Sequence, residues 1–184
     1  MVTIRAATVA DAAAISAVQR AAWFAAYEGI VQTALIDQVT RPDDGARVRE
    51  NFRLRPWQRT LVAVGPAADG VVGYASFGPE RDVQHAAWPP PLTSAGETGS
   101  VAELYALYVH PGWWSAGAGR GLMEQVLGKT AVSGFKDIVL WVLADNARAR
   151  RFYERAGFAT DGGTNVLTNL GGVLEVRYRR TPSV

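Results

Sequence analysis

Residues 107–120 read LYVHPGWWSAGAGR and decide the fold of this chain. The apolar run that opens this segment ends at His110-Pro111, because proline has no N–H to donate to a strand ladder. A glycine-rich turn follows, and beyond it apolar residues recur at helical spacing. We therefore predict a strand over Val101–Val109, a tight turn, and a helix from about Gly117 to Val132.

The turn itself is a candidate phosphate site. Gly117 and Gly119 have no Cβ, so a ligand can approach the backbone closely. The main-chain N–H groups from Ser115 to Arg120 lie at the start of the helix, where they have no helical partner and where the helix dipole favours negative charge. A pyrophosphate is the natural ligand of such a site. The alternative is a tight turn whose small residues serve packing alone.

Two common phosphate-binding motifs do not fit this turn. A dinucleotide fingerprint would need a third glycine where Leu122 stands. A P-loop would need glycine where Met123 stands. Both motifs are therefore excluded.

Short strands and helices alternate along the rest of the chain. Strands are predicted at residues 2–6, 60–64, 71–77, 137–143, from 158 onward and at 173–178, and helices at 8–27, 44–54 and 145–156. Turn residues between 65 and 70 predict an antiparallel hairpin, and the apolar run 137–143 indicates a strand buried on both faces. Residues 78–100 form a long loop in this interpretation.

Composition limits the kinds of chemistry that are available. The chain has 184 residues, 48% hydrophobic and 20% charged, which predicts one globular domain over residues 1–184. It contains no cysteine, which excludes disulfides, thiolate metal sites and cysteine nucleophiles. With only His85 and His110 as histidines, no metal site is expected.

The charge pattern and the N-terminus give no sign of a nucleic-acid or membrane partner. The net charge is only +2, and the basic residues are not interleaved with aromatic ones. The N-terminus lacks the basic and apolar regions of a signal peptide, and no apolar run approaches 18 residues. We expect a cytoplasmic protein.

Two segments resemble the GNAT N-acetyltransferase superfamily. The turn Trp114-Ser115-Ala116-Gly117-Ala118-Gly119 is similar to the acetyl-CoA loop of motif A, Arg/Gln-x-x-Gly-x-Gly/Ala, with Trp114 in place of Arg or Gln. The run Asn146-x-x-Ala149-x-x-Phe152-Tyr153-Glu154-x-x-Gly157-Phe158 resembles motif B. Residues 37–59 and 78–100 match nothing specific in the family.

The resemblance implies a fold, a reaction and a cofactor. The expected fold is α/β (α+β), a mixed and mostly antiparallel twisted sheet with helices on both faces. The expected reaction transfers an acetyl group from acetyl-CoA to a primary amine of a small molecule or a protein. Because no cysteine can hold an acetyl intermediate, direct attack in a ternary complex is expected. A homodimer is a further state seen in relatives.

The resemblance also assigns residues to the cofactor. The strand segment Leu107, Tyr108 and Val109 corresponds to the part of the family that pairs with pantetheine, and the backbone from Ser115 to Arg120, through Ala116, Gly117, Ala118 and Gly119, corresponds to the pyrophosphate loop. Asn146, Ala149 and Tyr153 lie three and four residues apart, hence on one helical face. Asn146 could bind the pantetheine arm, act as a plain N-cap, or do both.

Catalytic roles follow from the same comparison. Tyr153 corresponds to the family's general acid, whose hydroxyl donates to the departing thiolate. Glu103 is the candidate base, or else a solvated or paired residue at the start of a strand. Strand alternation places Glu103, Tyr105 and Leu107 on one face and Leu104, Ala106 and Tyr108 on the other, unless a bulge intervenes.

The sequence gives weaker signals for the residues that would bind the amine acceptor. Trp23 and Tyr27, with Phe24 and the loop around Trp88, could wall a pocket beside Glu103, although aromatics at helical spacing are more often core residues. A non-catalytic acyl-CoA-binding or sensor module is the alternative function, and a nucleic-acid-binding module is a distant third.

Overall fold

The computed structural model describes residues 2–66, 69–81 and 101–181. Within that part of the chain, seven strands form one sheet in the order β1-β2-β3-β4-β5-β7-β6. The strands are β1 Thr3–Ala6, β2 Arg59–Val64, β3 Val71–Pro79, β4 Val101–Val109, β5 Asp137–Leu143, β6 Ala159–Leu167 and β7 Val173–Arg180. All neighbours are antiparallel except β4 and β5. The mixed, mostly antiparallel sheet is confirmed.

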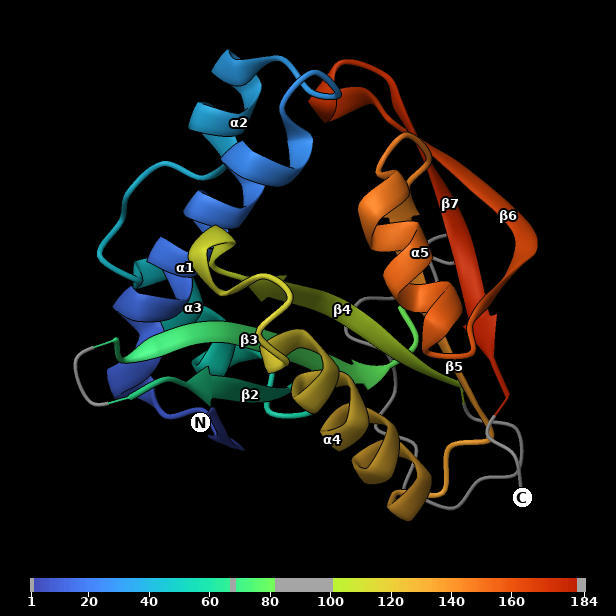
Figure 1. The fold of residues 1–184 in the computed structure, drawn as a ribbon, viewed down its shortest axis with the longest axis horizontal. Coiled ribbons are helices and arrows are strands. Elements are labelled where there is room, and N and C mark those ends of the chain that lie inside the picture. Colours follow the sequence, from blue (N-terminus) through green and yellow to red (C-terminus); the bar gives the residue numbers. More distant parts are fainter. Residues whose placement is uncertain (1, 67–68, 82–100, 182–184) are drawn as a thin grey trace.

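Helices cover both faces of this sheet, as predicted (Figure 1). They are α1 Ala12–Tyr27, α2 Thr33–Val39, α3 Ala46–Leu54, α4 Ala118–Val132 and α5 Ala147–Arg155, with short 3-10 turns at Val9–Asp11, Pro111–Trp113 and Thr168–Leu170. Leu122 of α4 and Tyr153 of α5 belong to the core on one face. Ile15 and Val18 of α1 belong to the core on the other.

The sheet opens between β4 and β5. These two strands pair in parallel only over Val101–Leu104 and Asp137–Leu140, so the rest of β4 has no strand partner on that side. A β-bulge at Tyr105 lies at the same point, because Leu104 pairs with Phe77 while Ala106 already pairs with Ser76. The divergence of β4 and β5 leaves a gap in the middle of the sheet.

The bulge overturns the simple alternation expected for β4. Leu104 and Leu107 both belong to the core under α4, whereas Ala106 and Tyr108 pack on the α1 side. Glu103 precedes the extra residue and therefore faces the α1 side, opposite to Leu107. The predicted shared face of Glu103 and Leu107 was wrong, because the bulged residue resets the two-residue period.

Most local predictions hold, and the differences are specific. The hairpin of β2 and β3 forms, and β5 is buried on both faces. The structure adds α2, which was not predicted, and it extends β3 to Pro79, so the first two residues of the predicted loop belong to a strand. His85 and Trp88 lie outside the described residues.

Two features are absent from the described residues. None of their helices is both long and apolar enough to cross a membrane. Nor do these residues contain a group of three or more acidic or histidine side chains that could hold a metal ion.

Candidate active site

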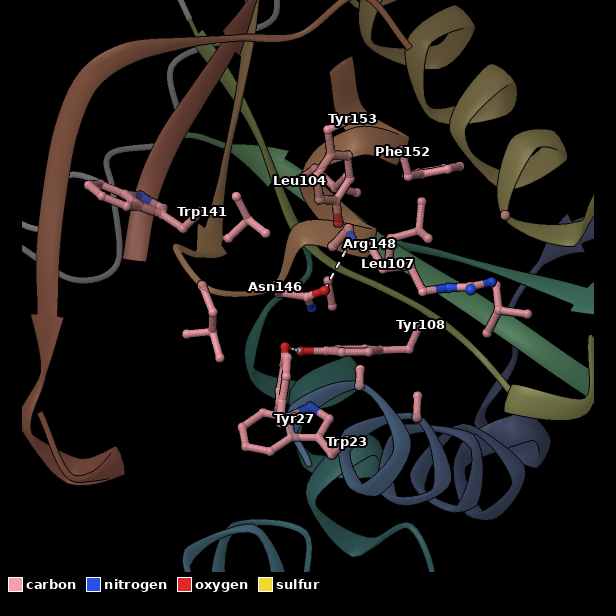
Figure 2. Close-up of a pocket in the computed structure, with 18 of the residues that line it drawn as sticks. Trp23, Tyr27, Leu104, Leu107, Tyr108, Trp141, Asn146, Arg148, Phe152 and Tyr153 are labelled. Atoms are coloured by element: carbon pink, nitrogen blue, oxygen red, sulfur yellow. Dashed lines mark hydrogen bonds between the residues drawn. The ribbon is translucent and has the colours of Figure 1, made fainter. Parts of the chain in front are cut away.

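A cavity of about 1310 Å³ fills the opening between β4 and β5. It is lined by α1, β4, the loop before α4, α5 and β7, and Figure 2 shows part of this lining. The structure brings almost all of the predicted site residues to this one cavity. Ala116 and Ala118 do not line it, and the side chain of Ala118 is buried in the core instead.

The loop before α4 has the geometry of an anion site. Gly117 caps the helix in the left-handed conformation, at φ 88°, and Ser115 is left-handed too, at φ 64°. The first helical hydrogen bond runs from the Gly121 N–H to the Gly117 carbonyl, 2.9 Å. Ahead of it, the N–H groups of residues 118–120 have no main-chain partner within the described chain. A Cβ built on Gly117 would meet no atom within 4 Å, so a phosphate has room there.

Trp114, which stands where the motif A resemblance would have Arg or Gln, is anchored beside this loop. Its Nε1 donates to the Val109 carbonyl at 2.8 Å. The guanidinium of Arg148 lies over its ring, 4.3 Å from the centroid. Residues 115–117 remain exposed, so Trp114 does not seal the loop.

Arginines make this end of the cavity cationic. Arg148, Arg151 and Arg155 lie on one face of α5 and line the cavity, together with Arg120 of α4. Arg150 points elsewhere on the same helix and donates to the Tyr178 hydroxyl at 2.9 Å. The charge at this end fits an anionic ligand such as a diphosphate.

The free edge of β4 presents main-chain groups to the cavity. The His110 N–H donates to the Val72 carbonyl of β3 at 2.8 Å. Because N–H directions alternate along a strand, the N–H groups of Leu107 and Val109 point the other way, toward the gap. The Val109 carbonyl is already used by Trp114, so the main chain of Leu107 and the Val109 N–H are the groups of this edge left for an amide-bearing ligand.

Asn146 caps α5 and faces the cavity. It is 8% exposed, and its Oδ1 accepts from the Ala149 N–H at 3.1 Å. Its Nδ2 has no hydrogen-bond partner among the described residues, so the cap leaves one donor group for a ligand.

Tyr153 lies in the wall of the cavity near Asn146 (Figure 2). The residue is 9% exposed and packs edge-on against Phe152 and Phe158, with centroids 5.3 and 6.1 Å away. Its hydroxyl has no hydrogen-bond partner in the described chain. Burial raises the pKa of Tyr153 above its usual range, so the hydroxyl keeps its proton at physiological pH and can act as a donor.

Among the described residues, Arg81 alone holds Glu103. The carboxylate is buried, 1% exposed, and accepts from the Arg81 main-chain N–H at 2.8 Å and from Nε at 3.1 Å; Nη2 also bonds to it. The same guanidinium lies over the Tyr105 ring, 4.5 Å from its centroid. Both carboxylate oxygens are therefore engaged, and the charge is compensated.

Aromatic side chains wall the cavity on the α1 side. The hydroxyls of Tyr27 and Tyr108 are 3.2 Å apart, and the Trp23 ring packs edge-on against Tyr27 at 5.0 Å (Figure 2). Trp23 is also a buried member of a core cluster with Leu143. Phe24 does not line the cavity; Arg20 stacks on its ring at 4.8 Å.

Glu175 is a cavity residue that sequence reasoning missed. It lies on β7, half-buried, and its Oε1 accepts from the Asn165 side-chain amide at 2.9 Å. Burial raises the pKa of Glu175 above its ordinary value. No motif marks it in the sequence, because the pairing of β7 with β5 alone brings it opposite Leu143.

Comparison with known proteins shows which family this chain is similar to. The model of the acetyltransferase (GNAT) family matches residues 21–158. A probable N-acetyltransferase of Mycobacterium tuberculosis is 27% identical over 176 residues, 94% of this chain and 88% of the relative. A second, uncharacterized N-acetyltransferase of that organism is 35% identical over 94 residues, 50% of this chain and 48% of the relative.

The relatives with higher identity match over shorter stretches. The chain spans only 20% to 48% of the length of these relatives. Among solved structures, the PaiA N-acetyltransferase of Thermoplasma acidophilum, in complex with coenzyme A, has 17% identity and a TM-score of 0.71, covering 99% of both chains. At 17% identity, this structural similarity supports a shared fold only. Since the family match spans well over half of the sequence, the chain belongs to the acetyltransferase (GNAT) family.

Proposed function

We propose that this protein transfers an acetyl group from acetyl-CoA to a primary amine. The observation that carries the proposal is the single cavity in the gap between β4 and β5, with a cationic, amide-lined end at α4 and α5 and a carboxylate-bearing end on the α1 side. Acetyl-CoA supplies the acetyl group as an activated thioester. The family match and the coenzyme A bound in a structural neighbour support this choice of donor.

The chain's own residues would hold the pyrophosphate and the pantetheine arm of such a donor. The N–H groups of residues 118–120 and the arginines of α5 would bind the pyrophosphate. The main chain of Leu107 and the Nδ2 of Asn146 would bind the amides of the pantetheine arm. The Leu107 N–H also faces the gap, where it could polarise the thioester carbonyl.

Tyr153 would act as the general acid in this reaction. Its protonated hydroxyl reaches the same cavity as the phosphate loop, and it would donate to the sulfur as the carbon–sulfur bond breaks. The sequence has no cysteine to carry the acetyl group, so the amine would attack directly while both substrates are bound.

One experiment separates transfer from mere binding. Isothermal titration with acetyl-CoA would be combined with a free-thiol assay on a panel of primary amines. We expect binding of acetyl-CoA and amine-dependent thiol release. Binding with no thiol release for any amine would identify a sensor module instead, and the absence of binding would overturn both functions.

A further inference from the structure

We infer that Glu175, rather than Glu103, binds the ammonium group of the acceptor and takes its proton, and that the acceptor is a singly charged amine with an apolar or aromatic body. This inference rests on the proposed acetyl transfer and names the substrate class of that site.

The two carboxylates that line the cavity in the described chain are in different states. Glu103 is fully buried, and both its oxygens accept from Arg81. Glu175 has one amide donor, Asn165, on Oε1 and forms no ion pair with a described residue, so Oε2 remains for a ligand. An ammonium ion entering the cavity therefore meets one uncompensated carboxylate.

The groups around Glu175 leave it as a negative subsite. Arg81 and Glu103 are near enough to act on it with opposite sign, and they form a pair with each other. On β7, Arg177 is occupied by Asp161, 2.8 Å away, and by Glu80. The facing residues on β5 and β6, Leu143 and Asn165, are uncharged. Tyr108, which is near enough for Glu175 to raise its pKa, stays neutral, and Arg55 also lines the cavity, where it acts on Tyr105.

The side chains that line the cavity beside Glu175 indicate the chemistry of the rest of the acceptor molecule. The cavity lining on this side is mostly apolar and aromatic, with the side chains of Trp23, Tyr27, Trp141, Leu143, Leu167 and Leu170. Such walls favour an apolar or aromatic body next to the charged nitrogen. A second positive charge would have no free carboxylate to meet among the described lining residues.

The protons balance with Glu175 in this role. An ammonium nitrogen loses two protons when its bond to the acetyl carbon forms and the carbon–sulfur bond breaks. Glu175 takes the first and passes it to water, and the second replaces the proton that Tyr153 gives to the departing sulfur. The raised pKa of Glu175 makes it a better proton acceptor than an ordinary surface carboxylate.

The test compares three matched variants in the full chain, with 2-phenylethylamine as the probe acceptor. Glu175→Gln keeps the shape and the hydrogen bond from Asn165 but removes the charge. Glu103→Gln removes the charge of the rival carboxylate, at the loss of one of its acceptor positions toward Arg81. Glu50→Gln, exposed on α3, is the control. Thiol release is measured from pH 5 to 9, and acetyl-CoA binding is measured by titration calorimetry.

We expect wild type and Glu50→Gln to acetylate the probe with a rate that rises with pH on the acid side. Glu175→Gln should lose about 100-fold in kcat/KM together with this acid limb, as removal of a general base does, while acetyl-CoA binding stays unchanged. Glu103→Gln should keep the acid limb.

Other results overturn the inference at separate points. Full activity of Glu175→Gln, or an acid limb lost only in Glu103→Gln, would reject Glu175 as the base. Acetylation of other amines but not of the probe would reject the substrate class. A protein that binds no acetyl-CoA would reject the proposed function itself.

Discussion

At the residue scale, Asp11 joins the first strand to the first helix. Its carboxylate accepts two bonds from Arg5, 2.7 and 2.8 Å, and one from the Thr8 main-chain N–H, 2.7 Å. The side-chain hydrogen bond from Arg5 is the main reason why the pKa of Asp11 falls to about 2. A carboxyl whose pKa is lowered by folding stabilises the native state above its unfolded pKa and loses this effect as the pH falls.

We expect Asp11→Asn to lower the free energy of unfolding at pH 7 by about 1–2 kcal/mol, a value reduced because Arg5 is half exposed. The difference from wild type should fall to about half at pH 3, because unfolded Asp11 is then largely protonated. Urea unfolding at both pH values measures it, with Glu50→Gln as the control. An equal difference at pH 7 and pH 3 would show that the charge of Asp11 is not the cause.

Tyr153 gives a second prediction at this scale. Its hydroxyl bonds to no described residue, so Tyr153→Phe should leave the fold intact and the affinity for acetyl-CoA unchanged. Turnover should fall by about 100-fold, because loss of a general acid costs roughly that factor. Steady-state rates across pH and titration calorimetry measure the two effects. Equal rates for both proteins at every pH would discard the acid role.

Some residues of the site could be predicted from sequence because their roles are local. Gly117 and Asn146 stand at helix starts, and a cap depends on residues within one turn. Glu175 could not be predicted, since its place in the cavity depends on the register of β7 against β5. The pairing of Arg81 with Glu103 could not be predicted either, because 22 residues separate the two in the sequence.

At the element scale, α3 is fixed against α1 by Gly45. This residue caps α3 at φ 80°, and a Cβ there would lie 2.5 Å from main-chain atoms of Ala12 and Ala13. We expect Gly45→Ala to destabilise the protein by about 2–3 kcal/mol through steric overlap and backbone strain. Gly128→Ala in α4, where a Cβ meets nothing within 4 Å, should instead stabilise by about 0.5–1 kcal/mol. Similar effects of both substitutions in denaturant unfolding would contradict this packing.

The contact between α5 and the loop before α4 gives a prediction about binding. Arg148 stacks on Trp114, so its charge is held beside the anion site. Arg148→Ala should weaken coenzyme A binding by about five-fold, the equivalent of about 1 kcal/mol, and this loss should shrink at high salt. Arg53→Ala, on the exposed side of α3, should have no effect. Titration calorimetry at two salt concentrations measures the affinity of each variant for coenzyme A. An unchanged affinity in Arg148→Ala would show that this arginine does not contribute to binding.

Hydrophobic periodicity was enough to predict which segments are helices and which are strands, but it did not predict the irregularities of these elements. The strands of the hairpin and the apolar β5 were predictable because their patterns are short and regular. The bulge at Tyr105 was not, because an extra residue shows only in the register with β3. Helix α2 is only seven residues long, too short for its pattern to stand out from the surrounding loops.

At the scale of the whole molecule, the separation of β4 and β5 organises the site. Parallel pairing stops at Leu104, and beyond this point the two strands diverge on either side of one cavity. Arginines of α4 and α5 gather at one end, and Glu103 and Glu175 lie at the other. The fold class was predictable from two motifs that resemble a family, but the point of divergence is a long-range property that local patterns do not contain.

In the proposed complex, the pyrophosphate of coenzyme A binds to the N–H groups that begin α4. The most direct measurement follows the backbone amide resonances of residues 117–120 during titration with coenzyme A and, separately, with pantetheine, which lacks the pyrophosphate. We predict large shifts of these resonances with coenzyme A and none with pantetheine. Binding of coenzyme A that leaves the four amide resonances unshifted would show that the pyrophosphate does not bind at the start of α4.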